Sequence, residues 1–229
     1  MERGLYIAAA GMLAEQARQD QISHDLANAA TNGYKPDRVA QRSFSQALLE
    51  NTATGQTIGP LGRGPVVDKM VTDMSQGELK STGAPLDLAI AGDGFFGLRT
   101  ARGVRYTRDG SFQSNGRGEL VDQFGNLVLG RGGNPVKVSG DGTVDADSVG
   151  VFALQGAVKA GDDQWTGTAG GQAQGQVLTA TLESSGVDAG HTMVEMMSSL
   201  RAYEANQKAV TTIDSTLGLG ATQVGSLQM

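Results

Sequence analysis

The chain has no cysteine among its 229 residues, and this absence removes several kinds of chemistry at once. Disulfides, thiolate nucleophiles and thiolate metal ligands are all excluded, and a chain without thiols is compatible with an oxidising space. Only two histidines are present, so the commonest general base and metal ligand is scarce as well. No apolar run approaches the ~20 residues that a membrane-spanning helix needs. The sequence therefore offers few residues for catalysis and no membrane span.

Aromatic residues and positive charge are also scarce. Aromatics make up 5% of the chain, and 18 Lys and Arg against 24 Asp and Glu give a net charge of −6. No basic run provides the charge that a phosphate backbone requires, so nucleic acid is not expected as a partner. Glycine is abundant instead, with 28 of its 34 residues between Gly55 and Gly190. Concentrated glycine with short apolar runs favours tight turns and short strands, which predicts a β-rich middle.

The two ends of the chain carry apolar stripes at helical spacing. The first stripe is interrupted by Glu15 and Gln19, and it consists of Met1, Leu5, Ala8, Met12, Ile22, Leu26 and Ala29. The second is interrupted by Gln207 and Asp214, and it consists of Met193, Met196, Leu200, Tyr203, Val210 and Leu217. Helices with polar gaps in the buried face are marginal alone and gain stability from partners in a defined register. The stripes therefore predict assembly.

These patterns predict an α+β fold, in which the N- and C-terminal helices pair as a coiled-coil-like unit around a β-rich middle domain of short strands. The first helix should end near Asn32-Gly33, because both residues tolerate the left-handed conformation and Pro36 cannot continue a helix. The expected segments are an N-terminal helix with its exit motif, an extended linker or hairpin, the β-rich domain and the C-terminal helix, at 1–36, 37–75, 76–187 and 188–229. Leu5 to Ala14 could pass for a signal-peptide core, but the stripe continues through Leu26, so no cleavage is expected.

Within the middle domain, short strands are expected between turn signals. Leu86, Leu88 and Ile90 alternate with other residues and place an apolar face on one strand. Further strands are expected at 104–108, 119–121, 127–129, 136–138, 151–154 and 177–182. Trp165, the sole tryptophan, falls in the glycine-rich stretch between the last two.

Three apparent motifs carry no function. Gly92 to Gly97 matches a Gly-x-Gly-x-x-Gly nucleotide fingerprint, but the pattern predicts a strand after it where that motif needs a helix. Asp109 to Glu119 mixes acids, amides and glycine but fails the spacing of a calcium loop. His24 and His191 could bind a metal only if the ends met with Asp25 and Asp188 nearby. No catalytic, cofactor-binding or metal-binding residue is therefore predicted, and no cofactor.

Several runs resemble the bacterial flagellar basal-body rod and hook family, and most of all its distal-rod branch. The helix exit NAATNGYK resembles the family's N-terminal signature through Asn28, Thr31, Gly33, Tyr34 and Lys35, although His24-Asp25 just upstream departs from it. The other matching runs are PLDLAIAGDGFF from Pro85, YTRDGSF from Tyr106, GELVDQFGNLVLG from Gly118 and RAYEANQKAV from Arg201. The resemblance covers both ends and the first half of the middle, in the family's order.

The resemblance implies a non-enzymatic, structural subunit that assembles into a helical tubular shaft and transmits torque from motor to hook. Family members leave the cell unfolded through the flagellar type III export apparatus without a cleaved signal, and they work outside the cytoplasm in the basal body. The implied partners are further copies of the chain in a helical filament, other rod and hook proteins, and the export apparatus. The expected assembly interface consists of Leu5, Met12, Ile22 and Leu26 packed against Met196, Leu200, Tyr203 and Val210.

Four alternatives remain open at this point. The chain could be another rod component with a β-domain, of the proximal rod, or a secreted adhesin or phage-tail-like β protein. The two stripes could also form an ordinary helix pair within a monomer. A glycan-cleaving enzyme would need two carboxylates across a groove, roughly 5 to 9.5 Å apart. Asp87, Asp93 and Asp109 lie in expected turns or solvent faces, and they do not indicate such a pair.

Overall fold

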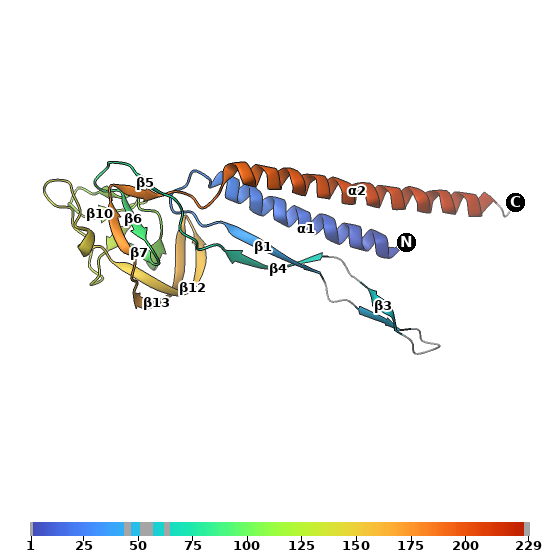
Figure 1. Cartoon of the computed structure of the whole chain (residues 1–229), viewed down its shortest axis with the longest axis horizontal. Coiled ribbons are helices and arrows are strands. Elements are labelled where there is room, and N and C mark those ends of the chain that lie inside the picture. The colour runs from blue at the N-terminus through green and yellow to red at the C-terminus, as the bar shows by residue number, and fades with distance from the viewer. Residues whose placement is uncertain (1, 44–46, 51–56, 62–64, 227–229) are drawn as a thin grey trace. The chain divides into compact units, whose positions relative to one another are not determined.

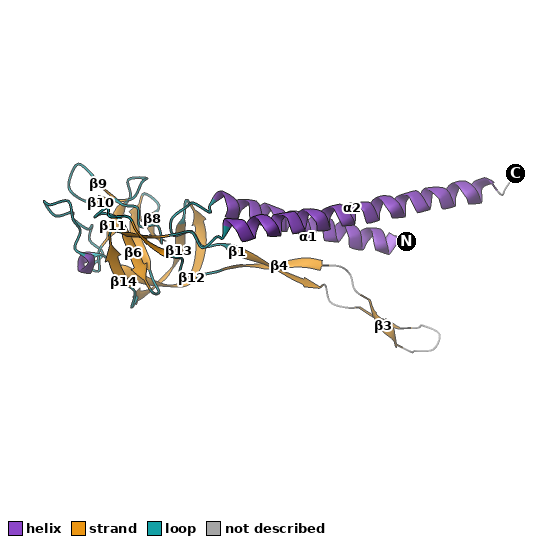
Figure 2. Cartoon of the chain, turned by 45° about the horizontal axis from the view of Figure 1, so that its top comes forward, coloured by secondary structure: helices purple, strands orange, loops and turns teal. Residues whose placement is uncertain are grey.

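The chain has an α+β architecture with two long helices and a β-rich middle, as the sequence predicted (Figures 1 and 2). The computed structural model describes residues 2–43, 47–50, 57–61 and 65–226. The chain divides into two compact units. The helical unit contains the residues before Asn28, Asp37–Thr72 and the residues from Ala189 onward. The β unit contains Asn28–Pro36 and Asp73–Asp188.

Helix α1 spans Glu2–Ala27 and helix α2 spans Ala189–Ser226. The sequence placed the end of the first helix near Asn32-Gly33, which is about five residues too late. The chain leaves the helix after Ala27 because turns follow at once, with the backbone N–H of Thr31 donating to the carbonyl of Asn28. The left-handed residue is Gly33, with φ of +69°, but it belongs to this turn segment and not to the helix terminus.

The two helices lie side by side and antiparallel within the helical unit (Figure 1). Their register follows from three contacts. A Cβ built on Gly4 would lie 3.3 Å from Ile213, one built on Gly11 would lie 2.9 Å from Asn206, and Ser199 contacts Glu15. Because α2 has 38 residues and α1 has 26, α2 continues past the N-terminal end of α1.

The helical unit also contains two antiparallel strand pairs. Strand β1 (Asp37–Ser43) pairs with β4 (Pro65–Thr72), with Asp37 opposite Thr72 and a bulge after Ala40. Strand β2 (Ala47–Glu50) pairs with β3 (Thr57–Leu61). Both β1 and β4 contact α1. This part of the chain is therefore a paired ribbon that packs along the first helix.

The β unit is built on a seven-stranded sheet in the order β12-β13-β8-β7-β11-β10-β9. The strands are β7 (Phe95–Thr100), β8 (Gly103–Thr107), β9 (Gln113–Ser114), β10 (Leu120–Val121), β11 (Leu127–Leu129), β12 (Val151–Gly161) and β13 (Gln164–Gln172). Strand β12 also pairs with β7, so β7, β8, β13 and β12 close into a ring. Two shorter pairs complete the unit, β5 (Leu79–Ser81) with β15 (Thr181–Glu183) and β6 (Leu88–Ala91) with β14 (Gln176–Thr179).

Strand β7 separates two apolar cores because successive side chains of a strand point to opposite faces. Phe95 packs with Tyr106 and Trp165 in the smaller core. Phe96 and the fully buried Leu98 belong to the larger core, which also contains Leu88, Ile90, Phe112, Leu120, Val128, Val136, Val144, Val149, Val151 and Val177. The alternation expected for Leu88 and Ile90 is confirmed, since both are buried in this core, with Leu86 packed partly buried against it.

The strand predictions fail at two places in the β unit. Residues 136–138 form no strand and make only isolated bridges, because Pro135 and the glycine turn before it interrupt a ladder. Trp165 lies inside strand β13, although the sequence placed it between strands. The run around it, QWTGTAGGQ, has the composition of a loop, and pairing with β12 and β8 holds it extended.

Strands β12 and β13 are joined by a two-residue turn, Asp162-Asp163. Both residues have φ of +52°, as a type I′ hairpin turn requires. Burial raises the pKa of Asp163, the carboxylate of Asp109 raises it further, and Lys159 lowers it. Burial also raises the pKa of Asp109, against hydrogen bonds from Ser111 that lower it. The turn therefore holds a carboxylate that is less easily ionised than in the unfolded chain.

Replacing Asp163 with Asn is expected to raise the free energy of unfolding at neutral pH, by less than about 1 kcal/mol because the group is partly screened by solvent. A raised folded-state pKa means that the folded protein binds the proton more tightly than the unfolded chain does. The carboxylate thus destabilises the fold at neutral pH, and this effect disappears as the pH falls through the raised pKa toward 3.8. Urea unfolding followed by Trp165 fluorescence at several pH values measures the difference. Asp162→Asn is the control for asparagine at positive φ, and an equal gain for both variants at every pH would contradict the electrostatic explanation.

Candidate functional site

The face that joins the two helices consists largely of small and polar side chains. On α1, Gly4, Gly11 and Glu15 contact α2, and the buried residues are Ala8, Gly11, Ala14, Gln21, Ile22 and Asp25. On α2 the corresponding residues recur every seven positions and are Thr192, Ser199, Asn206 and Ile213. Glycine and alanine at a helix contact let the two backbones approach closely. The pairing face is therefore narrow and buries few large apolar side chains.

A polar contact sets the register of this face. The Ser199 hydroxyl donates to the Glu15 carboxylate at 2.7 Å, and Ser199 is 1% exposed. Nearer the other end of α1, the Gln21 amide donates to Asp25 at 3.1 Å, and both side chains are buried. The Ser199–Glu15 contact joins the two helices and disfavours alternative registers, because any shift would leave a polar group without its partner. The Gln21–Asp25 bond lies within α1 and does not depend on the register.

The residues expected at the assembly interface occupy different positions around this face. Ile22 is buried, and Met12, Leu26, Met196, Tyr203 and Val210 are half-buried. Leu5 and Leu200 are 37% and 44% exposed. The register places Leu200 near the level of Glu15, so Leu26 and Leu200 do not face each other within the chain.

Large apolar side chains remain exposed along both helices of the single chain. Tyr6 and Leu13, seven residues apart on α1, are each 68% exposed. The remaining members of this exposed apolar set are Leu5, Ile7, Met193, Val194, Met197, Leu200, Leu217 and Leu219. Exposed contiguous apolar surface commonly marks a protein-binding surface. The helix pair therefore buries a narrow polar seam and presents apolar side chains outward.

The residues of the expected family motif lie in the β unit, in the segment that follows α1. Gly33, Tyr34 and Lys35 are buried, and Asn28 and Thr31 are half-buried and hydrogen-bonded to each other at 3.2 Å. This segment pairs with the one that precedes α2. The backbone N–H of Gly33 donates to the carbonyl of Glu183, and that of Gly186 donates to the carbonyl of Tyr34.

A buried charge cluster holds the same two segments together. Lys35, which is 2% exposed, donates to the Glu183 carboxylate and to the carbonyl of Ser75 at 2.7 Å. The other carboxylate oxygen of Glu183 accepts from Arg108 at 3.2 Å. Gly77 donates its backbone N–H to the first oxygen at 2.8 Å. All five residues belong to the β unit, and we call Lys35, Arg108 and Glu183 the junction cluster.

Aromatic contacts extend the junction cluster. The Arg108 guanidinium lies 5.3 Å from the centre of the Phe95 ring, and the Lys159 ammonium lies 4.6 Å from that of Tyr34. Lys159 also donates to the carbonyl of Lys35 at 2.6 Å. Desolvated cations over aromatic rings contribute roughly 1–2 kcal/mol. The segment after α1 is thus held by ionic, backbone and cation–π contacts together.

Sequence reasoning identified Lys35 but missed Arg108 and Glu183. Arg108 stood in a quoted family run without a role, and Glu183 was an isolated acid before the second helix. Lys35 and Glu183 are 148 positions apart, so no local spacing could have paired them. The sequence contains only a weak indication of this contact. A lysine just after one predicted helix and a glutamate just before the other could form an ion pair where the chain enters and leaves the middle domain.

The apparent metal and nucleotide motifs, for which no function was predicted, have ordinary structural explanations. His24 and His191 lie exposed on α1 and α2, and His191 faces Glu195 one turn along the helix at 3.3 Å. Among the described residues, no group of three or more His, Asp or Glu side chains could hold a metal ion. The glycine-rich run after β6 leads into strand β7 rather than a helix, which contradicts a nucleotide fingerprint.

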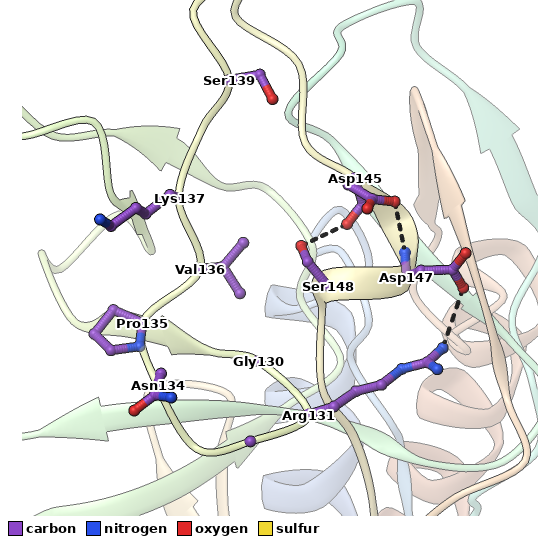
Figure 3. A pocket seen from close by; sticks show the side chains of 11 residues that line it. Gly130, Arg131, Asn134, Pro135, Val136, Lys137, Ser139, Asp145, Asp147 and Ser148 are labelled. Atoms are coloured by element: carbon purple, nitrogen blue, oxygen red, sulfur yellow. Dashed lines mark hydrogen bonds and ion pairs between the residues drawn. The ribbon is translucent and has the colours of Figure 1, made fainter.

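An open cavity of about 420 Å³ lies on the β unit between Gly130 and Ser148 (Figure 3). Three of its charged side chains are already engaged: Arg131 pairs with Asp147 at 3.3 Å, and Asp145 accepts from the backbone N–H of Asp147 at 3.1 Å. Both carboxylates come from one wall, where they belong to the short 3₁₀ turn and its cap. This arrangement is not the pair of facing carboxylates that glycoside hydrolysis requires.

Comparison with known proteins connects these features to one family. Residues 89–152 match the model described as flagellar hook protein FlgE/F/G D1 domain, and residues 178–223 match flagellar basal body rod FlgEFG protein C-terminal. The chain is 31% identical to the flagellar basal-body rod protein FlgG of Bacillus subtilis, over 95% of the chain and 97% of that protein. The chain belongs to the flagellar basal-body rod protein family.

Other relatives agree with this assignment. FlgG of Borreliella burgdorferi is 31% identical over 96% of the chain and 97% of its own length. FlgF of Caulobacter vibrioides is 31% identical over 99% of the chain and 98% of its own length. The predicted resemblance to the rod and hook family is confirmed, with the distal-rod FlgG proteins most similar. The rod protein is thus a structural subunit of the flagellar basal body, and its matches indicate no enzyme family.

The second family model covers the end of β14, all of β15 and most of α2, and it includes Glu183 of the junction cluster. The first covers β7 and β8 and includes Arg108. Within the described helices, none combines the length and hydropathy needed to cross a bilayer. The two family models therefore cover α2 and much of the larger core of the β unit, whereas α1 lies outside both of them.

Proposed function

We propose that this rod protein is a self-assembling subunit of the distal rod, and that its terminal helices pair in a coiled-coil-like manner and pack against helices of neighbouring copies. The observation that carries the proposal is the exposed apolar set along the helix pair. The pairing face itself repeats at three, four and seven residues, which is the spacing of coiled-coil contacts. Segments 1–36 and 188–229 would form the inner tube, and the β-rich domain, 76–187, would form the outer layer with 37–75 linking them.

The distribution of side chains supports contacts between copies more than a solitary helix pair. Small residues such as Gly11 and Ala14 fill the seam within the chain, whereas large ones such as Tyr6, Leu13 and Leu200 point away from it. A solitary pair would gain more by the reverse arrangement, because each buried large apolar side chain contributes about 1.5–3 kcal/mol. When each copy binds the next through the same head-to-tail contact, and the series of copies does not close into a ring, a helical filament results. Such a filament, held by many contacts along its length, suits a shaft that transmits torque.

The resemblance to the rod family also supplies the proposed export route and the proposed partners. The chain would reach the rod through the flagellar type III export apparatus, without a cleaved signal, and fold outside the cytoplasm. Its partners would be further copies of itself and the adjoining rod and hook proteins. Support comes from relatives named as rod proteins and from one named flagellar hook-basal body complex protein FlhO, of Bacillus subtilis, which is 27% identical over 99% of the chain and the whole of that protein.

The test is to replace Leu13 and Leu200 with Asp in the full chain. Both side chains are exposed, so the isolated subunit should keep its helical content and stability. Burying an unpaired carboxylate at a contact between copies costs several kcal/mol, which weakens each contact by about 100-fold or more. Rods should therefore be missing from basal bodies, and swimming should be lost. Electron microscopy of basal bodies and motility in soft agar measure the outcome.

The matched control is Gln16→Asp/Ser198→Asp, which adds the same two charges to exposed polar positions on α1 and α2. This variant should assemble more nearly like the unmodified protein. Normal rods in the Leu13→Asp/Leu200→Asp strain would contradict the proposed interface. Circular dichroism of the purified variants separates a failure of assembly from a failure to fold.

A further inference from the structure

The chain passes from one unit to the other at four points. Lys35 and Glu183 of the junction cluster, and the backbone groups of Ser75 and Gly77 that contact them, lie close in sequence to these points. Asn28–Pro36 contains Lys35, the segment from Asp73 contains Ser75 and Gly77, and Glu183 precedes α2 by six residues. The backbone N–H of Asp73 also donates to the carbonyl of Pro36 at 2.9 Å. All the segments that connect the two units are thus joined to one another inside the β unit.

From this arrangement we propose that the junction cluster is a latch that makes pairing of the terminal helices depend on the folded β unit. When the latch is closed, the end of α1 and the beginning of α2 are held together before the helices meet. When the latch is open and the β unit is unfolded, the two helices lie at opposite ends of a long flexible segment. The inference concerns folding of the single subunit, and it stands whether or not the proposed assembly interface is right.

Chain entropy gives the expected size of the effect. When the chain between the helices is unfolded, pairing α1 with α2 closes a loop of 161 residues, 28–188. With the latch closed, the Tyr34–Gly186 hydrogen bond shortens this path to ten residues, 28–34 and 186–188. The probability that chain ends meet falls with about the 3/2 power of loop length, so a 16-fold shorter path raises it about 60-fold. A narrow, largely polar helix seam has little apolar burial with which to replace this contribution.

Close backbone packing makes the latch selective for the docked conformation. Gly33 has φ of +69°, and a Cβ there would lie 2.4 Å from the backbone carbonyl of Arg108. A Cβ on Gly77 would lie 2.3 Å from the carbonyl oxygen of Ser184. Any side chain at Gly33 must therefore displace the segment that follows α1. Such a substitution opens the latch without touching either helix.

The experiment measures helix pairing directly, using the absence of native cysteine. Gly11→Cys and Asn206→Cys place thiols on facing positions of α1 and α2, where a Cβ on Gly11 lies 3.2 Å from Asn206 Cγ. The full-length protein is equilibrated with reduced and oxidised glutathione, and the fraction in which the two introduced cysteines form a disulfide is measured. This fraction gives the effective concentration of the two thiols relative to each other. Adding Gly33→Ala should lower this concentration by about fourfold, because the β1–β4 and β5–β15 pairs still shorten the path between the helices, to 24 residues (28–37, 72–79 and 183–188). Trp165 fluorescence reports in the same samples whether the β unit is folded.

Gly83→Ala is the matched control. Gly83 also has a left-handed φ, of +74°, but a Cβ there meets nothing within 4 Å. The control carries the same backbone strain in the β unit while leaving the latch closed, so its effective thiol concentration should stay within about twofold of the parent. An unchanged concentration in Gly33→Ala, with the β unit folded, would overturn the latch.

If the Gly33→Ala variant does not fold, a urea titration of the Gly11→Cys/Asn206→Cys protein tests instead whether helix pairing depends on the folded β unit. The latch predicts that the effective thiol concentration falls in the same transition as the Trp165 signal, because the β unit holds the helices together. Helix pairing that persists at full strength above the unfolding midpoint of the β unit would overturn the proposal. Loss of both signals in one transition would support it.

Discussion

Replacing Lys35 with Met is expected to lower the free energy of unfolding of the β unit by about 3–5 kcal/mol. The loss comes mainly from Glu183, which is 1% exposed and would keep its charge with one cation fewer. The carbonyl of Ser75 would also lose its donor. The effect should be larger than that of most substitutions, since a buried charge left without its partner is among the most destabilising changes known. Urea unfolding followed by Trp165 fluorescence measures it.

The control for this prediction is an ion pair in the same unit that is open to solvent. Arg131 and Asp147 lie 3.3 Å apart, with side chains 54% and 89% exposed. Arg131→Ala should cost less than about 1 kcal/mol, because exposed pairs gain little over their hydration. A cost for Lys35→Met no greater than that of Arg131→Ala would show that the junction cluster contributes nothing beyond an ordinary surface pair.

Replacing Gly110 with Ala should have a comparable effect for a steric reason. A Cβ at this position would lie 1.5 Å from the carbonyl oxygen of Leu88, where no atom can be accommodated. The backbone N–H of Leu88 donates to the carbonyl of Gly110 at 3.0 Å, so the clash would also separate a hydrogen-bonded pair. Leu88 is fully buried in the larger core, and moving it disturbs packing throughout β6. A loss of about 4 kcal/mol or more, or failure to fold, is the expected result.

Gly116 supplies the comparison for that variant. It lies in the same part of the β unit, and a Cβ there meets nothing within 4 Å. Gly116→Ala should change the free energy of unfolding by no more than about 0.5 kcal/mol. Thermal and urea unfolding of the two alanine variants side by side measures the contrast. A Gly110→Ala protein as stable as Gly116→Ala would mean that the chain can separate β6 from the Gly110 turn at little cost.

The sequence predicted the features of the rod protein that depend on local patterns. Apolar spacing indicated both helices, and alternation indicated the β6 strand with Leu88 and Ile90 facing inward. The apolar periodicity identified the side of each helix that is apolar, but not which residues contact the other helix. Leu5 and Met12 fit the same repeat as Gly4 and Gly11, one position away, and close backbone packing decides between them.

Long-range contacts account for most of what the sequence did not indicate. Strand β13 has a loop-like composition and becomes extended through pairing with β8 and β12. Arg108 and Glu183 gain their role from a fold that brings them to Lys35, and neither carries a local signal. The end of α1 was misplaced because Gly33 owes its left-handed backbone to packing on Arg108, not to a helix terminus.

The ring of β7, β8, β13 and β12 has a consequence for the proposed assembly, in which many copies of the chain would gather at one place. Open sheet edges attract strands of other molecules and promote aggregation at high local concentration. Strand β12 pairs with β7 only at Val151 and Phe152, and β13 pairs with β8 only at Gln164 and Trp165. Beyond these residues the two strands pair only with each other, so the outer edges of the β12–β13 hairpin are open to a strand of another molecule. Among the described strands of the β unit, this hairpin is thus the longest template for adventitious strand addition, and it is the place where crowding of subunits would first be felt.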